Sequence, residues 1–223
     1  MKHSKYVIVL GTAIALYLCP VAAADLTNGG FETGDLTGWT ATGPVQAVNW
    51  EFSRDFLGLP QAPASGFWDP TEGSWFASLW STDYVTDTAS LTQTFTTPAD
   101  GWRLEFDYFF DFGDYALYPD TAMATLTGPS GPVTLFEHNT PGYELGDDEN
   151  IDWTHIVAPL PTVGSYTLEF TTAETILPGA FESILGVDTV EVVPVPGAML
   201  LGSIGLSFSS WLLRRRRTAW NQP

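Results

Sequence analysis

The sequence is poor in cysteine and in positive charge. Of its 223 residues, one is cysteine and 8 are Lys or Arg, against 26 Asp or Glu. Six of the eight basic residues lie near the two ends. All 26 acids lie between residues 25 and 193, together with only Arg54 and Arg103. That segment carries a formal charge of −24, which excludes nucleic acid as a partner because phosphate neutralisation requires Lys and Arg.

Residues 1–24 have the pattern of a secretory signal peptide. A positive start precedes an apolar run over residues 6–18, and the small residues Ala22 and Ala24 mark a cleavage site. We expect cleavage after Ala24. An uncleaved anchor is the alternative, although the apolar run is short for a membrane span. The single cysteine, Cys19, precedes the cleavage site, so the mature chain would have no thiol for a disulfide or a metal site.

The C-terminal segment has the pattern of a membrane anchor. Residues 196–213 form an apolar run just long enough to cross a thin bilayer. The run is followed by four basic residues, Arg214, Arg215, Arg216 and Arg217. Because basic residues stay on the cytoplasmic side, we expect a transmembrane helix over 196–213 and a cytoplasmic tail over 218–223. The acidic segment is then placed outside the cytoplasm.

A short proline-containing motif leads into this run. It consists of Val193, Pro194, Val195, Pro196, Gly197 and Ala198. With the apolar run and the Arg cluster, it resembles the PEP-CTERM sorting signal of exported proteins of Gram-negative bacteria, with valine where the commonest form has glutamate. The resemblance spans 193–217 and implies export across the inner membrane, processing by an exosortase, and a place at the cell surface or in a biofilm matrix. A plain C-terminal anchor is the alternative.

Residues 25–192 have the pattern of one all-β domain. Apolar and polar residues alternate in short runs separated by Gly, Pro and Asp clusters, and no run keeps a helical period for three turns. Strands are predicted over 90–96, 102–112, 122–127, 133–137, 155–159, 165–171 and 187–193. A long loop is expected over 56–73 and an exposed acidic turn over 147–149. This number of short strands predicts a β-sandwich.

Three phrases narrow the fold class. They are 26–39 at the start of the mature chain, 89–95 in the middle, and 164–170 with 185–190 near the end. Their order is similar to that of jelly-roll, carbohydrate-binding-module-like (galactose-binding-like) domains. The resemblance spans nearly all of 25–193. It implies a jelly-roll β-sandwich whose first and last strands lie together, often beside a structural calcium ion.

The same resemblance nominates calcium ligands. Glu32 and Asp188 are the matching carboxylates, and Asn28 with loop carbonyls could complete the shell of oxygens that calcium requires. The alternative is that a turn at Gly29-Gly30 leaves both carboxylates in solvent or bound to backbone amides. Calcium is thus expected as a structural cofactor, with this alternative open.

Aromatic residues are the second group of candidates. Seven tryptophans lie in the acidic segment, and sugar rings present C–H faces that stack on such flat rings. Trp50, Trp68 and Trp75 flank the long loop, close to several acids, and are predicted to contact a glycan. The alternative is that tryptophans fill the core, which we expect of Trp39 and Trp102.

The sequence offers little sign of catalysis. His138 and His155 are the only histidines in the segment, and neither lies in a metalloprotease or nucleophile motif. With 26 acids, some pair of carboxylates always suits glycoside hydrolysis, so such a pair is uninformative. We therefore expect a non-catalytic exported protein that binds extracellular polysaccharide. A structural calcium-stabilised surface protein is the first alternative, and a secreted glycoside hydrolase the second.

Overall fold

The structure is a computed structural model that describes residues 24–52, 66–81, 88–111, 120–139, 150–174 and 183–195. These residues form twelve strands and, within the described ranges, no helix. The strands are β1 (Thr40–Thr42), β2 (Val45–Val48), β3 (Glu51–Phe52), β4 (Phe67–Trp68), β5 (Phe76–Trp80), β6 (Thr88–Thr97), β7 (Trp102–Asp111), β8 (Asp120–Gly128), β9 (Gly131–Asn139), β10 (Ile151–Leu160), β11 (Gly164–Glu174) and β12 (Ile184–Pro194).

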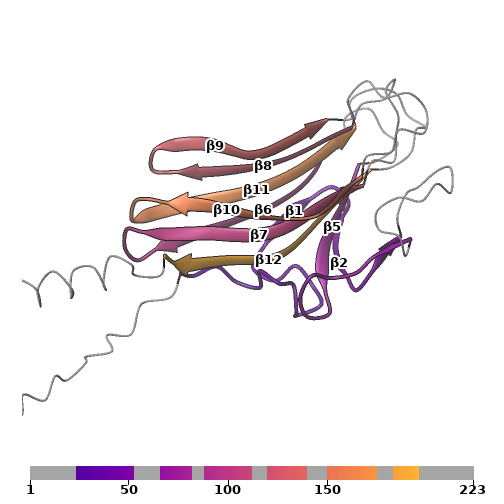
Figure 1. Ribbon diagram of the computed structural model, residues 1–223, viewed down its shortest axis with the longest axis horizontal. Helices are drawn as coiled ribbons and strands as arrows, with labels where there is room; N and C mark the ends of the chain where they lie inside the picture. The colour runs from indigo at the N-terminus through magenta and orange to yellow at the C-terminus, as the bar shows by residue number, and fades with distance from the viewer. Residues whose placement is uncertain are drawn as a thin grey trace, which may run out of the picture.

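The strands pack as a β-sandwich of two antiparallel sheets (Figure 1). Sheet A has the order β1-β6-β11-β8-β9 and sheet B the order β10-β7-β12-β5-β2, while β3 and β4 form a separate pair. Without β1 and β2, strands β5 to β12 divide into β5-β12-β7-β10 and β6-β11-β8-β9. This is the strand order of an eight-stranded jelly roll, so the predicted fold class is confirmed.

The core lies between the sheets and follows the alternation of the strands. On β7, Leu104, Phe106 and Phe110 are fully buried against sheet A, because side chains two residues apart share one face. Trp39 and Trp102 are 8% and 4% exposed and belong to this core, as predicted.

A second, smaller cluster lies on the outer face of sheet B. Trp68, Phe76, Phe109 and Ile184 are its buried members. The Trp68 and Phe109 rings are stacked, with centroids 4.0 Å apart and planes 3° from parallel. This face of sheet B is therefore covered at one end, and β4 lies within the region expected to be only a loop.

All seven predicted strands are present, and five others were not predicted. Strand β5 lacks an apolar–polar alternation because both of its faces are covered: Leu79 packs in the main core and Phe76 in the outer cluster. Strand β12 runs past the expected domain boundary at residue 192, to Pro194, and the Val195 amide donates to the Gly101 carbonyl at 2.9 Å.

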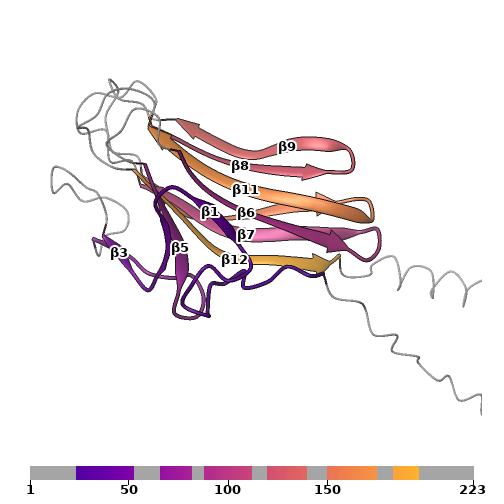
Figure 2. The ribbon, with the colours of Figure 1, turned by 180° about the vertical axis from the view of Figure 1, so that it is seen from behind.

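The N-terminal segment around Gly29 lies beside the last strand, whereas the first strand itself, β1, pairs with β6 of sheet A and not with β12. The Val190 amide on β12 donates to the Gly29 carbonyl at 3.0 Å, and both ends of the described chain leave the sandwich on the same side (Figure 2). No helix within the described ranges is long and apolar enough to cross a membrane. Residues 1–23 of the predicted signal peptide, including Ala22, and the tail from Pro196 lie outside those ranges, so both stay predictions. Ala24, at the predicted cleavage site, is the first described residue and packs against the main core.

Candidate functional site

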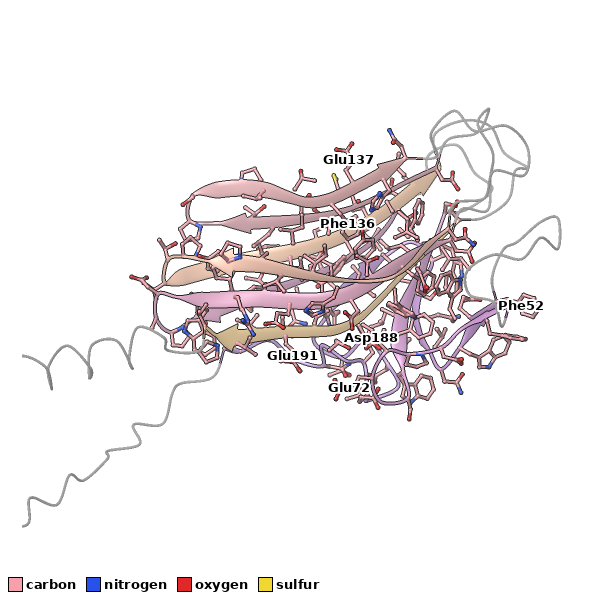
Figure 3. The ribbon with its side chains drawn as sticks, viewed as in Figure 1. Phe52, Glu72, Phe136, Glu137, Asp188 and Glu191 are labelled. Atoms are coloured by element: carbon pink, nitrogen blue, oxygen red, sulfur yellow. The ribbon has the colours of Figure 1, made fainter. Side chains whose placement is uncertain are left out.

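Three exposed aromatic rings gather on the β3–β4 pair. Trp50, Phe52 and Phe67 are 50%, 53% and 41% exposed. The ring centroids of Phe52 and Phe67 are 4.8 Å apart, those of Trp50 and Phe67 5.6 Å, and those of Trp50 and Phe52 6.4 Å. Phe52 projects from the edge of the molecule in Figure 3. We call these three side chains the aromatic platform.

Strand alternation explains why these rings face solvent. Phe52 is paired with Phe67, and Glu51 with Trp68. Because neighbouring residues of a strand point to opposite faces, Phe52 and Phe67 point outward when Trp68 points inward onto sheet B.

The inward residues fix the platform to the sandwich. The Trp68 Nε1 donates to Oδ2 of Asp111 at 2.6 Å, and the Trp68 ring is stacked on Phe109. Glu51 accepts a hydrogen bond from the Ser78 hydroxyl of β5 at 3.2 Å. The exposed rings are therefore presented on a hairpin whose other face is buried and hydrogen-bonded.

The structure separates the three tryptophans that were predicted to contact sugar. Trp50 belongs to the platform. The prediction for Trp68 is wrong: its side chain is 1% exposed and its ring is stacked on Phe109, so it is not open to a ligand. Trp75 is partly buried against the main core, with its ring lying over Gly34. The two rings that accompany Trp50 are phenylalanines that the sequence did not single out.

A pair of carboxylates, Glu32 and Asp188, forms a second feature, which we call the acid clamp. Asp188 is fully buried on β12. Its Oδ2 accepts from the Thr71 amide at 2.8 Å, the Thr71 hydroxyl at 2.9 Å and the Glu72 amide at 3.2 Å, and its Oδ1 accepts from the Thr189 amide at 2.7 Å. Asp188 and Glu72 lie close together in Figure 3.

Glu32 binds the other end of the loop formed by residues 71–75. Its Oε1 accepts from the Ser74 amide at 2.8 Å and from the Trp75 amide at 3.0 Å. Gly73 has a φ of +67°, which favours glycine, and a Cβ there would lie 2.3 Å from Glu32 Cδ, so a larger residue would displace the Glu32 carboxylate. The clamp thus ties the N-terminal segment and the last strand to residues 71–75.

The hydrogen bonds of the acid clamp engage the carboxylates that were expected to bind calcium. Burial raises the pKa of the Asp188 carboxyl, and the hydrogen bonds from Glu72, Thr189 and Thr71 oppose that rise. Within the described ranges, no three Asp, Glu, His or Cys side chains converge as a metal site. The observed arrangement is the alternative in which backbone amides satisfy the carboxylates, and calcium stays a prediction.

The third proposed ligand, Asn28, is used within its own turn. Its side-chain amide donates to the Asp35 carbonyl at 2.9 Å and accepts from the Thr33 amide at 3.3 Å. Its carbonyl accepts from the Phe31 amide at 3.2 Å and the Trp39 indole at 3.1 Å. Asn28 therefore builds the opening turn, and its oxygens are already engaged.

A row of charged side chains crosses the outer face of sheet B beside the clamp. His155 Nδ1 lies 2.8 Å from Oδ1 of Asp107, and its Nε2 lies 3.5 Å from Oε2 of Glu105. Glu105 is also paired with Arg103. Asp107 lies opposite Asp188 in the register of β7 and β12. The row therefore gives this face both hydrogen-bond donors and hydrogen-bond acceptors, next to the loop that the clamp holds.

Comparison with solved structures finds sandwich domains. TmCBM61, solved with β-1,4-galactotriose, is 18% identical with a TM-score of 0.49, over 76% of this chain and 97% of that one. A family 22 carbohydrate-binding module of Clostridium thermocellum is 14% identical with a TM-score of 0.38, over 75% and 94%. The K3 cleaved adhesin domain of Lys-gingipain from Porphyromonas gingivalis is 14% identical with a TM-score of 0.41, over 75% and 98%.

These identities and TM-scores say nothing about the ligand of this chain. No protein-family model matches the sequence, and no curated protein matches it. The class that the fold defines is therefore a jelly-roll β-sandwich, and its function has to be argued from its own residues.

Proposed function

We propose that this chain is a non-catalytic exported protein whose sandwich binds extracellular polysaccharide at the aromatic platform. The observation that carries the proposal is the exposure of Trp50, Phe52 and Phe67 on a hairpin with a buried inner face. Three large apolar rings in water are unfavourable unless a ligand covers them. The C–H faces of a sugar ring suit such a surface, and the strongly acidic surroundings disfavour polyanionic ligands.

Export and sorting complete the proposal. The signal pattern ending at Ala24 and the tail over 193–217 support delivery to the cell surface or matrix by way of an exosortase. Calcium bound between Glu32 and Asp188 would stabilise the domain. In a strain that lacks exosortase, we expect the tail to stay attached, which intact-mass measurement of the exported protein would show. An unchanged mass would contradict the sorting signal.

Binding of polysaccharide is the direct test. Residues 25–195 contain every described strand and the whole described core, and this domain can be titrated against a glycan array and against the host's own matrix polysaccharide. We expect Trp50→Ala and Phe67→Ala each to weaken binding about tenfold or more, because losing an aromatic anchor costs about 2 kcal/mol. Val157→Ala, at another exposed apolar position, is the matched control and should bind normally.

Two outcomes would redirect the proposal. Absence of binding to every polysaccharide would favour the structural surface protein, in which the sandwich is only a scaffold. Binding that survives loss of the platform residues would place the glycan elsewhere, with the charged row of Asp107 and His155 as the next surface to test.

A further inference from the structure

We propose that one end of the sandwich lies directly on the surface of a lipid bilayer while the chain is anchored. We call it the exit end. It comprises the turns 98–101, 129–131 and 161–163, together with Pro194 and Val195. This inference rests on the membrane anchor of the proposed function and is independent of sugar binding.

The chain has no spacer between the sandwich and the apolar run. Strand β12 ends at Pro194, and the amide of Val195 is bonded to the Gly101 carbonyl of the exit end. The apolar run begins at residue 196. Because an extended residue spans at most about 3.5 Å, the exit end cannot stand away from the membrane that takes up the run.

All the turns of the exit end lie on the side of the sandwich where β12 ends. Pro194 pairs with Trp102 at the start of β7, and Trp102 pairs with Leu160 at the end of β10. The β8–β9 turn and the β10–β11 turn lie on the same side, where the chain leaves in both ribbon views (Figures 1 and 2). The docking surface is therefore formed by several elements of both sheets.

The exit end is apolar and nearly uncharged in a very acidic domain. Val163 and Val195 are 55% and 50% exposed, and Val133, just beyond the 129–131 turn, is 57% exposed. The one ionisable residue in these turns is Asp100, whose carboxylate accepts from the Val163 amide at 2.6 Å. Placing this surface in the headgroup region removes apolar area from water without stripping water from many charges.

An apolar recess opens at the same end. Its volume is about 240 Å³, and its lining includes Leu126, Pro129, Val133, Ala158, Pro161 and Tyr166. Such a recess can take part of an acyl chain from the adjoining bilayer. Val133 is both exposed and part of the recess lining, so the recess adds to the apolar surface of the exit end.

Depth-dependent fluorescence quenching tests the docking. The full chain carrying Cys19→Ser is reconstituted into phosphatidylcholine vesicles with one new cysteine, Val163→Cys, labelled with an environment-sensitive dye. Asn139→Cys, exposed at the far end of β9, is the matched control. We expect the dye at position 163 to emit at shorter wavelength and to be quenched by nitroxide-labelled lipid at least twofold more strongly than the dye at 139.

The outcomes are distinct. If the chain does not float with the vesicles, both the anchor and the docking are overturned. If it floats but the dye at 163 stays as exposed to water as the dye at 139, the docking alone is overturned. A shifted emission without lipid quenching would assign the exit end to a second copy of the chain, which also contradicts the proposal.

Discussion

Asp188 shows how one buried side chain organises two distant parts of the chain. Its carboxylate accepts four hydrogen bonds, three of them from Thr71 and Glu72, more than a hundred residues earlier. It also steadies Thr189, whose φ of 51° is unfavourable for a β-branched residue and accompanies the bulge in β12. Loss of this side chain therefore affects the loop and the strand together.

Replacing Asp188 should destabilise the domain measurably. We expect Asp188→Ala to lower the free energy of unfolding by about 2–3 kcal/mol, because buried amides lose their acceptor, and Asp188→Asn to lower it less. The control Glu169→Ala, on the exposed face of sheet A, should stay within about 0.5 kcal/mol of the wild type. Urea unfolding measures all three, and equal stability of Asp188→Ala and Glu169→Ala would contradict the clamp.

The Asp188→Ala variant also tests whether calcium binds at the acid clamp. If the ion binds at the clamp, calcium should raise the melting temperature of the wild type over that in chelator, and should leave Asp188→Ala unchanged. Equal melting temperatures in all four measurements would exclude the ion from this place.

His138 predicts a dependence of stability on pH. Its Nε2 lies 2.9 Å from the Tyr108 hydroxyl, and burial lowers the pKa of the imidazole below its ordinary value of 6.5. The folded state therefore disfavours the charged form. Its contribution to stability is complete above pH 6.5 and is lost as the pH falls through the lowered value.

A pair of histidine variants isolates this effect. We expect the melting temperature of His138→Phe, which keeps a ring beside Phe136, to fall less between pH 7 and pH 5 than that of the wild type. His155→Gln should leave the wild-type contribution of His138 in place. Parallel pH profiles for His138→Phe and the wild type would contradict the assignment.

At the scale of elements, the β3–β4 hairpin depends on a glycine in another strand. The Phe109 ring packs directly over Gly186 of β12, where a Cβ would lie 1.9 Å from Phe109 Cε1. The other side of the ring carries Trp68. Gly186 therefore sets the position of the whole stack beneath the aromatic platform.

Gly186→Ala should displace that stack. We expect a loss of about 1–3 kcal/mol from overpacking, and a changed near-ultraviolet circular dichroism signal from the Trp68 ring. Gly30→Ala is the matched control, because a Cβ there would approach only Glu32 Cγ, at 3.8 Å. A near-wild-type spectrum for Gly186→Ala would show that the stack can shift without cost.

The elements also show what a single sequence can predict. Strand β7 was predictable because Leu104 and Phe106 alternate with Arg103 and Glu105, one face buried and the other polar. Strand β5 was not, because both its faces are covered. The aromatic platform could not be predicted for another reason. Phe52 and Phe67 come together because two strands of two residues each pair although 14 residues separate them, and no local pattern encodes that pairing.

The residues of the candidate site were also predictable only in part. Glu32 and Asp188 were singled out as a pair by resemblance, and the structure does bring them to one loop. Their partners there are backbone amides of 71–75, which no side-chain motif reveals. Trp68 was misassigned because a tryptophan beside a loop has the same sequence context whether its ring is buried or exposed.

For the whole molecule, the boundary of the domain can be tested by truncation. A fragment ending at 192 loses the pairing of Val193 with Arg103 and the bond from Val195 to Gly101. Because a backbone hydrogen bond contributes about 1 kcal/mol, we expect 25–192 to be about 1–2 kcal/mol less stable than 25–195. Its melting temperature should be lower by roughly 2–8 °C. Extension to 198 serves as control and should add nothing.

The place of β12 in sheet B has a consequence for the order of events in the cell. It is the last strand to be synthesised, yet it lies between β7 and β5, in the interior of the sheet. The sandwich therefore cannot close until the ribosome has translated past residue 194. Until then β5 and β7 lack their shared neighbour. A chain exported and anchored as proposed would therefore reach the translocation channel before its sandwich can close.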